Sequence, residues 1–390
     1  MTTADTECDV LVVGAGPGGN AVAFALAQRG WNVILAERLR YPADKLCGEF
    51  LSADGVAVLN RLGMWPESGH EPFPRIGEVS LSATDGSLWT SELPDAGVGC
   101  SRLRLDHMLM DACRGIGVQV VEGIRVRRVN GDFGGGFVAQ ASADDEERSF
   151  RSRLVVVAYG KHGRLTGEGP QEEHDPRMAH QNQLMALKVH IEADAGALRQ
   201  LAGKVELHGF PGGYAGLGEV EGDTINLCLL TQVARFREAG FDCERFSSQW
   251  MMQNPALAGR LEMLRPKWAG RLAQANLSFG SRRRSRNGVL YLGDSAGSIT
   301  PLCGDGMSMA LRSAELVSPE IDRFLQGTIT GSRLLHDWKR LWRAEFRRRL
   351  RLGRLLQWVL MGGGKRAARV IRLLQSSPAL SRWLIRQTRR

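Results

Sequence analysis

The chain has 390 residues, 43% of them hydrophobic, and a formal net charge of +9. That length can bury a core and suggests two or three domains or subdomains. The seven cysteines form no C-x-x-C pair and leave an odd one, which argues against a disulfide scaffold and favours a reduced, cytoplasmic setting. The eight histidines show no metal-ligand spacing. No apolar run reaches 18 residues and the N-terminus lacks a basic start, so neither a membrane span nor a signal peptide is expected.

The first predicted element is a buried parallel strand over residues 8–13, a short valine-rich run. It leads into Gly14, Gly16 and Gly19, which fit the pattern G-x-G-x-x-G. In such a turn the first glycine permits the tight bend, the second lets backbone approach a pyrophosphate, and the third lets the helix pack on the strand. A helix is predicted over residues 20–28, and the amides and dipole at its start favour a diphosphate.

A second strand is predicted over residues 31–36, and Glu37 stands at its end, 23 residues after Gly14. A carboxylate at this place is expected to accept hydrogen bonds from the hydroxyls of an adenosine ribose, and it disfavours a 2′-phosphate. The pattern therefore predicts a dinucleotide other than NADP in this crevice. The alternative is a tight turn without a ligand.

The next segments return the chain to the nucleotide domain. A hairpin with an Asp-Gly turn is predicted over residues 77–91, and a helix over residues 102–114. Several strands are predicted over residues 118–157, and the last of them, 154–158, reads as buried.

Residues 181–275 are expected to form a substrate domain. Four segments there alternate between apolar and polar residues well enough to predict an antiparallel sheet that covers one face of the cofactor. They are residues 184–191, 205–207, 213–217 and 224–230.

A second glycine-rich segment follows a predicted strand that ends at Gly293 and Asp294. Asp294 is expected to cap the next turn or to accept a hydrogen bond from a ribityl hydroxyl, and Pro301 with the glycines after it lets backbone pass close to a flat ring. A helix predicted over residues 306–317 would turn its N-terminus to the isoalloxazine, where it favours the anionic reduced flavin. Alone, this segment could equally be an ordinary strand, loop and helix. Paired with the segment that begins at Gly14, it predicts FAD.

The C-terminal region carries the whole excess of positive charge. Residues 333–390 hold 17 Lys and Arg against two acids, which leaves 34 basic and 40 acidic residues before them. Apolar residues recur at helical spacing from Leu335 through Trp338 and Trp342, which predicts an amphipathic helix. A hinge is predicted at Gly362–Gly364, and a second stretch of basic and apolar residues follows it. Such helices suit an anionic membrane surface. The alternative is a stripe that packs on the protein's own substrate domain. Nucleic acid is not expected, because the tryptophans favour lipid.

Four places carry a family resemblance, namely Gly14–Gly19 with Glu37, residues 44–49 (Asp-Lys-Leu-Cys-Gly-Glu), residues 101–106 (Ser-Arg-Leu-Arg-Leu-Asp) and residues 293–307. Over about residues 8–330 the chain resembles the FAD-dependent superfamily of aromatic-hydroxylase-type monooxygenases, flavin halogenases and geranylgeranyl reductases. Residues 45–49 and 300–307 look most similar to the geranylgeranyl-reductase-like branch, which includes oxidoreductases of lipophilic polyketide or quinone-type products. The halogenase pattern Gly-x-Trp-x-Trp-x-x-Pro has no match here.

The resemblance implies an α/β fold with three parts, the first of which is made of two segments. These are a Rossmann-like FAD-binding domain with a parallel sheet (1–180 and 276–330), an α+β substrate domain with an antiparallel sheet (181–275), and a helical basic C-terminal region (331–390).

The resemblance also assigns roles to single residues. Arg102 would reach the FAD diphosphate or ribityl region, Val126 would lie beside the adenine, and Lys45 would stabilise negative charge on the reduced flavin. Cys47 is either a packed residue or a catalytic thiol, and Tyr214 either lines the substrate face or belongs to the core. The cofactor-binding candidates are Gly14, Gly16, Gly19, Glu37, Arg38, Lys45, Cys47, Arg102, Val126, Gly160, Gly293, Asp294, Pro301, Gly304, Gly306 and Met307. The catalytic candidates are Lys45, Cys47 and Tyr214, and no metal ligand is expected.

Three functions remain open at this point. The first is an FAD-dependent, monooxygenase-like oxidation or hydroxylation of a lipophilic, aromatic, polyketide or quinone-type substrate. The second is saturation of isoprenoid C=C bonds, as the resemblance to geranylgeranyl reductases implies. The third is a flavoprotein that oxidises a side chain of a partner protein. The electron donor is left open between NADH or NADPH and a partner. The expected location is the cytoplasm, with peripheral contact to the inner face of the membrane through residues 333–390 as a further expectation.

Overall fold

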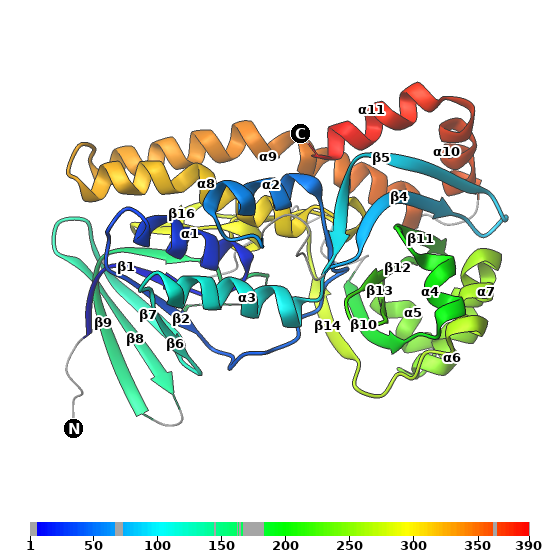
Figure 1. Ribbon diagram of the computed structural model, residues 1–390, viewed down its shortest axis with the longest axis horizontal. Coiled ribbons are helices and arrows are strands. Elements are labelled where there is room, and N and C mark those ends of the chain that lie inside the picture. Colours follow the sequence, from blue (N-terminus) through cyan, green and yellow to red (C-terminus); the bar gives the residue numbers. More distant parts are fainter. Residues whose placement is uncertain are drawn as a thin grey trace.

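The computed structural model describes residues 6–66, 73–143, 146–161, 163, 165–166, 183–361 and 365–389. Two large sheets lie side by side, each packed against its own helices (Figure 1). This mixed architecture confirms the predicted fold class, with a parallel sheet in the nucleotide-binding half and a mainly antiparallel sheet in the other. None of the helices within these ranges combines the length and the hydropathy that a bilayer-spanning segment needs.

The first sheet has the strand order β16-β17-β9-β1-β2-β6, and all but β16 run parallel along this path. β1 is buried almost throughout because it lies between two neighbours with helices on the sheet, which explains its continuous valine-rich run. The hairpin of β7 and β8 extends the sheet antiparallel from β9. The bounds are β1 Thr6–Val13, β2 Val33–Glu37, β6 Gln119–Glu122, β7 Arg125–Asp132, β8 Gly136–Ala143, β9 Glu146–Val157, β16 Ser285–Arg286 and β17 Val289–Tyr291.

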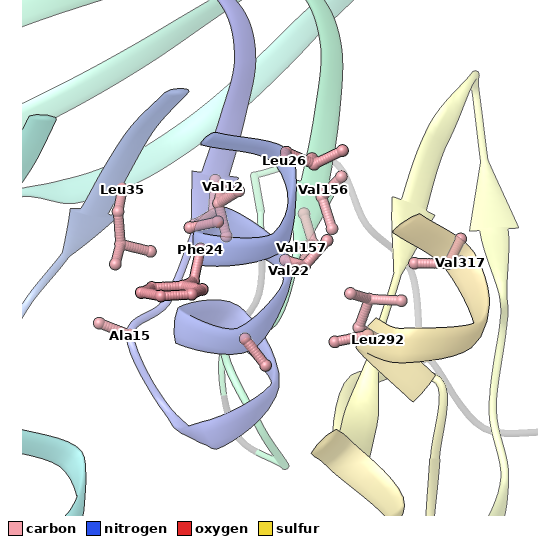
Figure 2. Close-up of a cluster of buried hydrophobic side chains, with 14 of the residues drawn as sticks. Val12, Ala15, Val22, Phe24, Leu26, Leu35, Val156, Val157, Leu292 and Val317 are labelled. Carbon is pink, nitrogen blue, oxygen red and sulfur yellow. The ribbon is translucent and has the colours of Figure 1, made fainter. Parts of the chain in front are cut away.

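Helix α1 (Pro17–Ala27) begins three residues before the predicted start at Asn20. Pro17 holds a helical backbone angle at the first position, and Gly16 is the extended N-cap, so the helix starts directly at the glycine turn. Figure 2 shows its side chains between those of strands β1, β2 and β9 and those of Leu292 and Val317, all within one buried cluster. This sandwich joins the two glycine-rich segments of the sequence. The other helices of this half are α2 (Ala53–Leu62), α3 (Arg102–Gly115) and α8 (Gly306–Leu325).

The second sheet has the order β14-β10-β13-β12-β11-β4-β5-β3. The four predicted strands of residues 184–230 pair antiparallel as expected. The hairpin of β4 and β5 also belongs to this sheet, because β4 pairs in parallel with β11. The domain bounds predicted from the sequence instead assign this hairpin to the first part of the FAD-binding domain, residues 1–180. The bounds are β3 Phe50–Leu51, β4 Arg75–Ser82, β5 Leu88–Gly99, β10 Leu184–Glu192, β11 Lys204–Phe210, β12 Gly213–Val220, β13 Thr224–Gln232 and β14 Leu272–Leu277.

The two faces of the second sheet have different partners, because successive side chains on a strand point to opposite faces. On β13, Leu227 and Leu229 pack against the helices that cover the outer face, whereas Cys228 and Leu230 point to the other side. The covering helices are α4 (Ala195–Leu201), α5 (Val233–Glu238), α6 (Cys243–Trp250) and α7 (Pro255–Leu264). The short elements are β15 Gly280–Ser281, β18 Gly297–Ser298, and the 3-10 helices η1 Met251–Gln253, η2 Gly293–Ser295 and η3 Pro301–Cys303.

The C-terminal region is helical, as predicted, in α9 (Gly331–Met361), α10 (Lys365–Ser376) and α11 (Pro378–Arg389). The aromatic stripe of α9 is buried, with exposed fractions of 0% for Trp338 and 2% for Trp342. It packs into the core of the nucleotide-binding half, where the indole N–H of Trp338 donates to the carbonyl of Tyr291 at 3.2 Å. The stripe therefore does not face a membrane, and it lies on the nucleotide-binding half instead of the substrate domain. The predicted hinge at Gly362–Gly364 lies outside the described residues.

Candidate cofactor and substrate site

A cavity of about 230 Å³, here called the main cavity, lies where the two sheets meet. One side of its wall comes from the start of α1, the ends of β9 and β17, and the loop that leads into α8. The other side comes from the inward face of the second sheet, and this side is mostly apolar. Of the predicted site residues, the wall contains Gly16, Cys47, Arg102, Gly160, Tyr214, Gly293, Asp294, Pro301, Gly304, Gly306 and Met307.

The three glycines of the first turn have different surroundings. Gly14 has a φ of +103°, and an added Cβ would lie 2.7 Å from the carbonyl oxygen of Ala158. A Cβ on Gly19 would lie 1.8 Å from the carbonyl oxygen of Gly14. Both glycines are thus needed for the turn and for the close approach of helix to strand. Among the described residues, a Cβ on Gly16 would meet only the guanidinium of Arg102, at 3.5 Å, so Gly16 alone turns its open side to the main cavity.

Glu37 lies at the end of β2 and is 5% exposed. Its carboxylate accepts hydrogen bonds from the backbone amides of Ala15 at 2.7 Å and of Leu39 at 3.0 Å. Each carboxylate oxygen can accept a second hydrogen bond, so Glu37 can still accept one from a ribose hydroxyl. Arg38 is exposed, and Val126 is buried on β7. The predicted cofactor residues that do not line the main cavity are Gly14, Gly19, Glu37, Arg38, Lys45 and Val126.

The second glycine segment meets the first through α8. A Cβ on Gly18 would lie 3.1 Å from the carbonyl oxygen of Ala310, so α1 and α8 approach closely because a glycine stands there. The backbone amide of Gly160 donates to the hydroxyl of Ser295 at 3.0 Å, which ties the end of β9 to the turn after β17. Asp294 Oδ2 lies 3.7 Å from Lys161 Nζ, so the carboxylate in this turn has a cationic neighbour.

A charged cluster lies behind the glycine turn. Arg102 donates from Nε and Nη2 to Asp106 at 2.9 and 2.6 Å, and Lys45 Nζ lies 3.1 Å from the same carboxylate. Burial by itself would raise the pKa of Asp106, but Arg102 and Lys45 beside it bring the pKa below its ordinary value. Lys45 also bonds to the hydroxyl of Tyr41. The structure therefore places the ammonium of Lys45 among carboxylates near the glycine turn, and Lys45 itself does not line the main cavity.

A second charged cluster centres on Glu49, whose side chain is 0% exposed. Glu49 Oε1 accepts from Lys188 Nζ at 2.6 Å and from the backbone amide of Arg102 at 2.8 Å, and Oε2 lies 2.6 Å from His190 Nε2. Lys188 also donates to Asp44 at 2.5 Å. The sequence prediction missed Lys188. Its signal was present, because Lys188 and His190 stand two apart in an otherwise apolar strand and so share a face.

Asp305 forms a third buried group, next to the start of α8. Its carboxylate accepts from the hydroxyl of Ser52 at 3.2 Å and from Arg349 Nη1 of α9 at 3.0 Å. Burial raises the pKa of Asp305 to about 6, although Arg349 acts in the opposite direction. The group lines the main cavity and was not among the predicted site residues. One arginine of the basic C-terminal region, Arg349, is therefore buried and pairs with a carboxylate at the main cavity.

The two remaining catalytic candidates, Cys47 and Tyr214, both line the main cavity. The carbonyl of Cys47 accepts from the side-chain amide of Asn226 at 3.1 Å, which holds residues 44–49 on the second sheet. Burial raises the pKa of the Tyr214 hydroxyl well above its ordinary value, so it stays protonated at neutral pH. The hydroxyl of Tyr214 has the hydroxyl of Thr300 and the backbone of Leu302 as neighbours, so polar partners are available to it within the protein.

The residues present fit FAD. A diphosphate would fit beside the open side of Gly16 and near Arg102. It would also meet the backbone amides in the first turn of α1, which have no acceptor within the helix. Gly293, Gly304 and Gly306 line the main cavity, and Gly293 and Gly304 adopt φ values of +55° and +62°, which favour glycine.

Comparison with known proteins agrees with this fit. The family model described as "FAD binding domain" matches residues 7–340. The chain is 28% identical over 363 residues to digeranylgeranylglycerophospholipid reductase 1 of Methanothermobacter thermautotrophicus, which covers 87% of this chain and 83% of that protein. It is 25% identical over 336 residues to the menaquinone reductase of Mycolicibacterium smegmatis, which covers 80% of this chain and 76% of that protein.

Two solved structures share the fold. The flavin-dependent brominase Bmp2 has a TM-score of 0.80 and 18% identity, with 98% of this chain and 93% of that chain covered. PqsL of P. aeruginosa in complex with 2-aminobenzoylacetate has a TM-score of 0.74 and 19% identity, with 94% of this chain and 100% of that chain covered. At these identities the likeness extends to the fold alone.

Proposed function

This chain belongs to the FAD-binding-domain family and is an FAD-dependent oxidoreductase, and we propose that it acts as a monooxygenase on a lipophilic, ring-bearing substrate. The observation that carries the proposal is the two-sided wall of the main cavity. One side is built for a dinucleotide, and the other presents apolar side chains of the second sheet. A substrate held between them would be mostly apolar, because burying its polar groups there would cost free energy without compensating hydrogen bonds.

In this proposal the FAD is held by residues at both glycine segments. The amides at the start of α1 and the guanidinium of Arg102 hold the diphosphate, and Glu37 holds the adenosine ribose. Asp294 accepts from the ribityl chain, and the N-terminus of α8 stabilises negative charge on the ring. When bound, FAD supplies the hydride and oxygen chemistry, while the protein supplies position, electrostatics and exclusion of water.

The chain's own residues then control protons and water near the ring. Asp305 has a pKa of about 6, so it can hold or release a proton near neutral pH at the cavity wall. The protonated hydroxyl of Tyr214 can donate to a polar group on the substrate ring. The apolar side of the wall, which includes Leu207 and Leu230, excludes water from the reacting groups.

A second candidate is saturation of isoprenoid C=C bonds. Relatives named as digeranylgeranylglycerophospholipid reductase and menaquinone reductase match most of the chain, which favours this reaction. It uses the same cofactor and the same apolar wall, so only the reaction itself separates the two candidates.

The test measures oxygen consumption. The FAD-loaded protein is reduced anaerobically with NADH and, separately, with NADPH, and is then mixed with air and 3-pentylphenol. The monooxygenase proposal predicts oxygen uptake that depends on the phenol and yields a product with one added oxygen. If the phenol changes nothing, and the reduced enzyme without air converts a prenylated menaquinone to a product whose side chain has gained two hydrogens at one C=C bond, the reductase candidate replaces it.

We also propose a peripheral membrane contact through the C-terminal helices. The exposed fractions are 55% for Leu355, 59% for Trp358, 53% for Leu373 and 50% for Trp383, and arginines surround them in the sequence. Exposed tryptophans on basic helices suit the interface of an anionic membrane. Such a contact would bring the enzyme to a lipophilic substrate at the inner face of the membrane.

A further inference from the structure

A second cavity, of about 110 Å³ and here called the apolar chamber, lies between the second sheet and helices α9, α10 and α11. Its wall includes Trp89 and Leu93 of β5, Leu360 of α9, Val370 of α10 and Leu384 of α11. We propose that this chamber holds the alkyl or prenyl tail of a substrate whose ring lies in the main cavity. This inference rests on the proposed function and adds a second binding region to it.

The chamber adjoins the main cavity. Val79, Leu207, Leu302 and Cys303 line both spaces and so form the partition between them. Leu302 and Cys303 belong to η3 and are partly exposed, whereas Val79 and Leu207 belong to β4 and β11. In this proposal, a chain attached to a ring in the main cavity passes between these four residues into the chamber.

The chamber wall is mostly apolar. The indole N–H of Trp89 donates to the hydroxyl of Ser381 at 3.1 Å, and this hydroxyl donates to the carbonyl of Leu374 at 2.8 Å. The polar atoms around Trp89 are thus satisfied by one another, and the indole presents carbon to the chamber. An apolar cavity offers water too few hydrogen-bond partners, so it favours an apolar occupant.

Polar contacts fix the helices over the chamber. The side-chain amide of Gln375 donates to the carbonyl of Leu88 at 2.6 Å, and Arg372 Nη2 lies 2.5 Å from Asp85 Oδ2. Both contacts join α10 to the β4–β5 hairpin, so the roof of the chamber has a defined position. The helices of the basic region therefore form part of a binding wall, in addition to any contact with a membrane.

The size of the chamber selects the ligand. Its volume is comparable to the apolar cavity of about 150 Å³ that binds benzene, so it accepts roughly four to six carbons of a chain. Each buried methylene raises affinity about fourfold. The expected substrate is therefore an amphiphile with a polar ring and an unbranched or prenyl tail.

The first experiment detects the tail alone. Full-length, FAD-loaded protein is titrated with 10-bromodecan-1-ol, whose bromine quenches a tryptophan that it touches. We expect saturable quenching, which falls at least fivefold in Trp89→Phe. In Val370→Phe, whose ring enters the chamber, half-quenching needs at least tenfold more ligand. Ile116→Phe is the matched control, because Ile116 follows α3, is 38% exposed and does not line the chamber, and it leaves the titration unchanged.

If Val370→Phe does not fold, Leu384→Phe narrows the chamber from another helix and takes its place. Quenching that does not saturate, or that is the same in the narrowed variant and in Ile116→Phe, contradicts the proposed role of the chamber.

The second experiment joins the tail to the ring. Phenol, 3-pentylphenol and 3-decylphenol are titrated, and binding is read from the flavin absorbance. We expect 3-pentylphenol to bind at least thirtyfold more tightly than phenol, and Val370→Phe to lose this gain while its affinity for phenol stays within twofold. Saturable tryptophan quenching without any change of flavin absorbance on addition of phenols supports the chamber as a tail-binding site and contradicts the proposed substrate. Turnover of phenols without dependence on chain length leaves the function standing and overturns the chamber.

Discussion

Glu49 Oε1 lies 2.6 Å from Lys188 Nζ, although 139 residues separate them in the sequence. The side chains of the two residues are 0% and 1% exposed. Glu49 also holds His190 and the backbone amide at the start of α3. One carboxylate thus connects the segment of residues 44–49, the second sheet and the helix that carries Arg102.

Removal of Lys188 tests this connection. Lys188→Met leaves Glu49 buried without its cation, so we expect the free energy of unfolding to fall by about 3–5 kcal/mol. The double variant Glu49→Gln/Lys188→Met removes both charges and should recover part of this loss, with a coupling energy of about 2 kcal/mol or more. Urea unfolding of the four proteins measures the cycle. Additive effects of the two substitutions would contradict a direct pair.

Arg102→Lys tests the proposed diphosphate contact. Lysine keeps the positive charge beside Asp106 but cannot make the two parallel hydrogen bonds of the guanidinium. We expect FAD to bind about ten- to thirtyfold more weakly, which corresponds to about 1.4–2 kcal/mol. Equilibrium titration of the apoprotein with FAD measures the change.

Arg61→Lys is the control for that substitution. Arg61 makes a comparable pair with Glu315 at 2.6 Å, and its side chain is 55% exposed. Surface pairs contribute little, so this variant should bind FAD as the wild type does. Equal losses in both variants would show that Arg102 acts only through general stability.

Gly16→Ala tests the open side of the glycine turn. The new methyl group would occupy the space beside Arg102, so FAD affinity should fall by at least tenfold while the apoprotein keeps its stability. Gly115→Ala is the matched control, because a Cβ there meets nothing within 4 Å in the described part of the chain. FAD titration and thermal unfolding measure the two effects separately. Unchanged affinity in Gly16→Ala would place the diphosphate elsewhere.

Asp305 predicts a specific pH dependence of stability. Its pKa is raised to about 6 in the folded protein from 3.8, so the folded state holds the proton more tightly than the unfolded chain. Ionisation therefore costs stability as the pH rises from about 4 to about 6, and the whole cost is present above that range. Asparagine does not titrate. The unfolding free energy of Asp305→Asn relative to the wild type should thus increase by about 2–3 kcal/mol from pH 4 to pH 7.

Urea unfolding at a fixed excess of FAD measures this difference at each pH. Asp132→Asn is a control with the opposite sign, because backbone amides of Gly135 and Gly134 lower the pKa of Asp132. A flat difference for Asp305→Asn between pH 4 and pH 7 would show that the carboxyl is ionised throughout this range.

The proposed membrane contact depends on the exposed tryptophans. The double variant Trp358→Ser/Trp383→Ser should bind vesicles that contain phosphatidylglycerol at least tenfold more weakly, since each indole would bury apolar area in the interface. Added salt should weaken wild-type binding as well. Co-sedimentation measures both. Phe241→Ser is the control, because Phe241 is 54% exposed but lies outside the C-terminal helices. Wild-type protein that stays in the supernatant would refute the contact.

Several elements could be predicted because their signals are local. The strand, glycine turn and helix from Thr6 to Ala27 follow from a valine run, three glycines at fixed spacing and a proline at the helix start. The antiparallel strands of residues 184–232 follow from alternation of side chains. In contrast, the membership of the β4–β5 hairpin in the second sheet depends on pairing with β11, more than 100 residues away, and no local pattern encodes that pairing.

The cofactor half of this protein is readable from the chain alone, because glycine spacing and strand composition act through backbone geometry within a few residues. The partners of Glu49, the raised pKa of Asp305 and the burial of Trp338 and Trp342 emerge only in the folded protein. Burial and charge pairing gain their free energy only when faces that are distant in the chain meet. An amphipathic helix has the same sequence pattern whether its apolar face meets lipid or the core of its own protein.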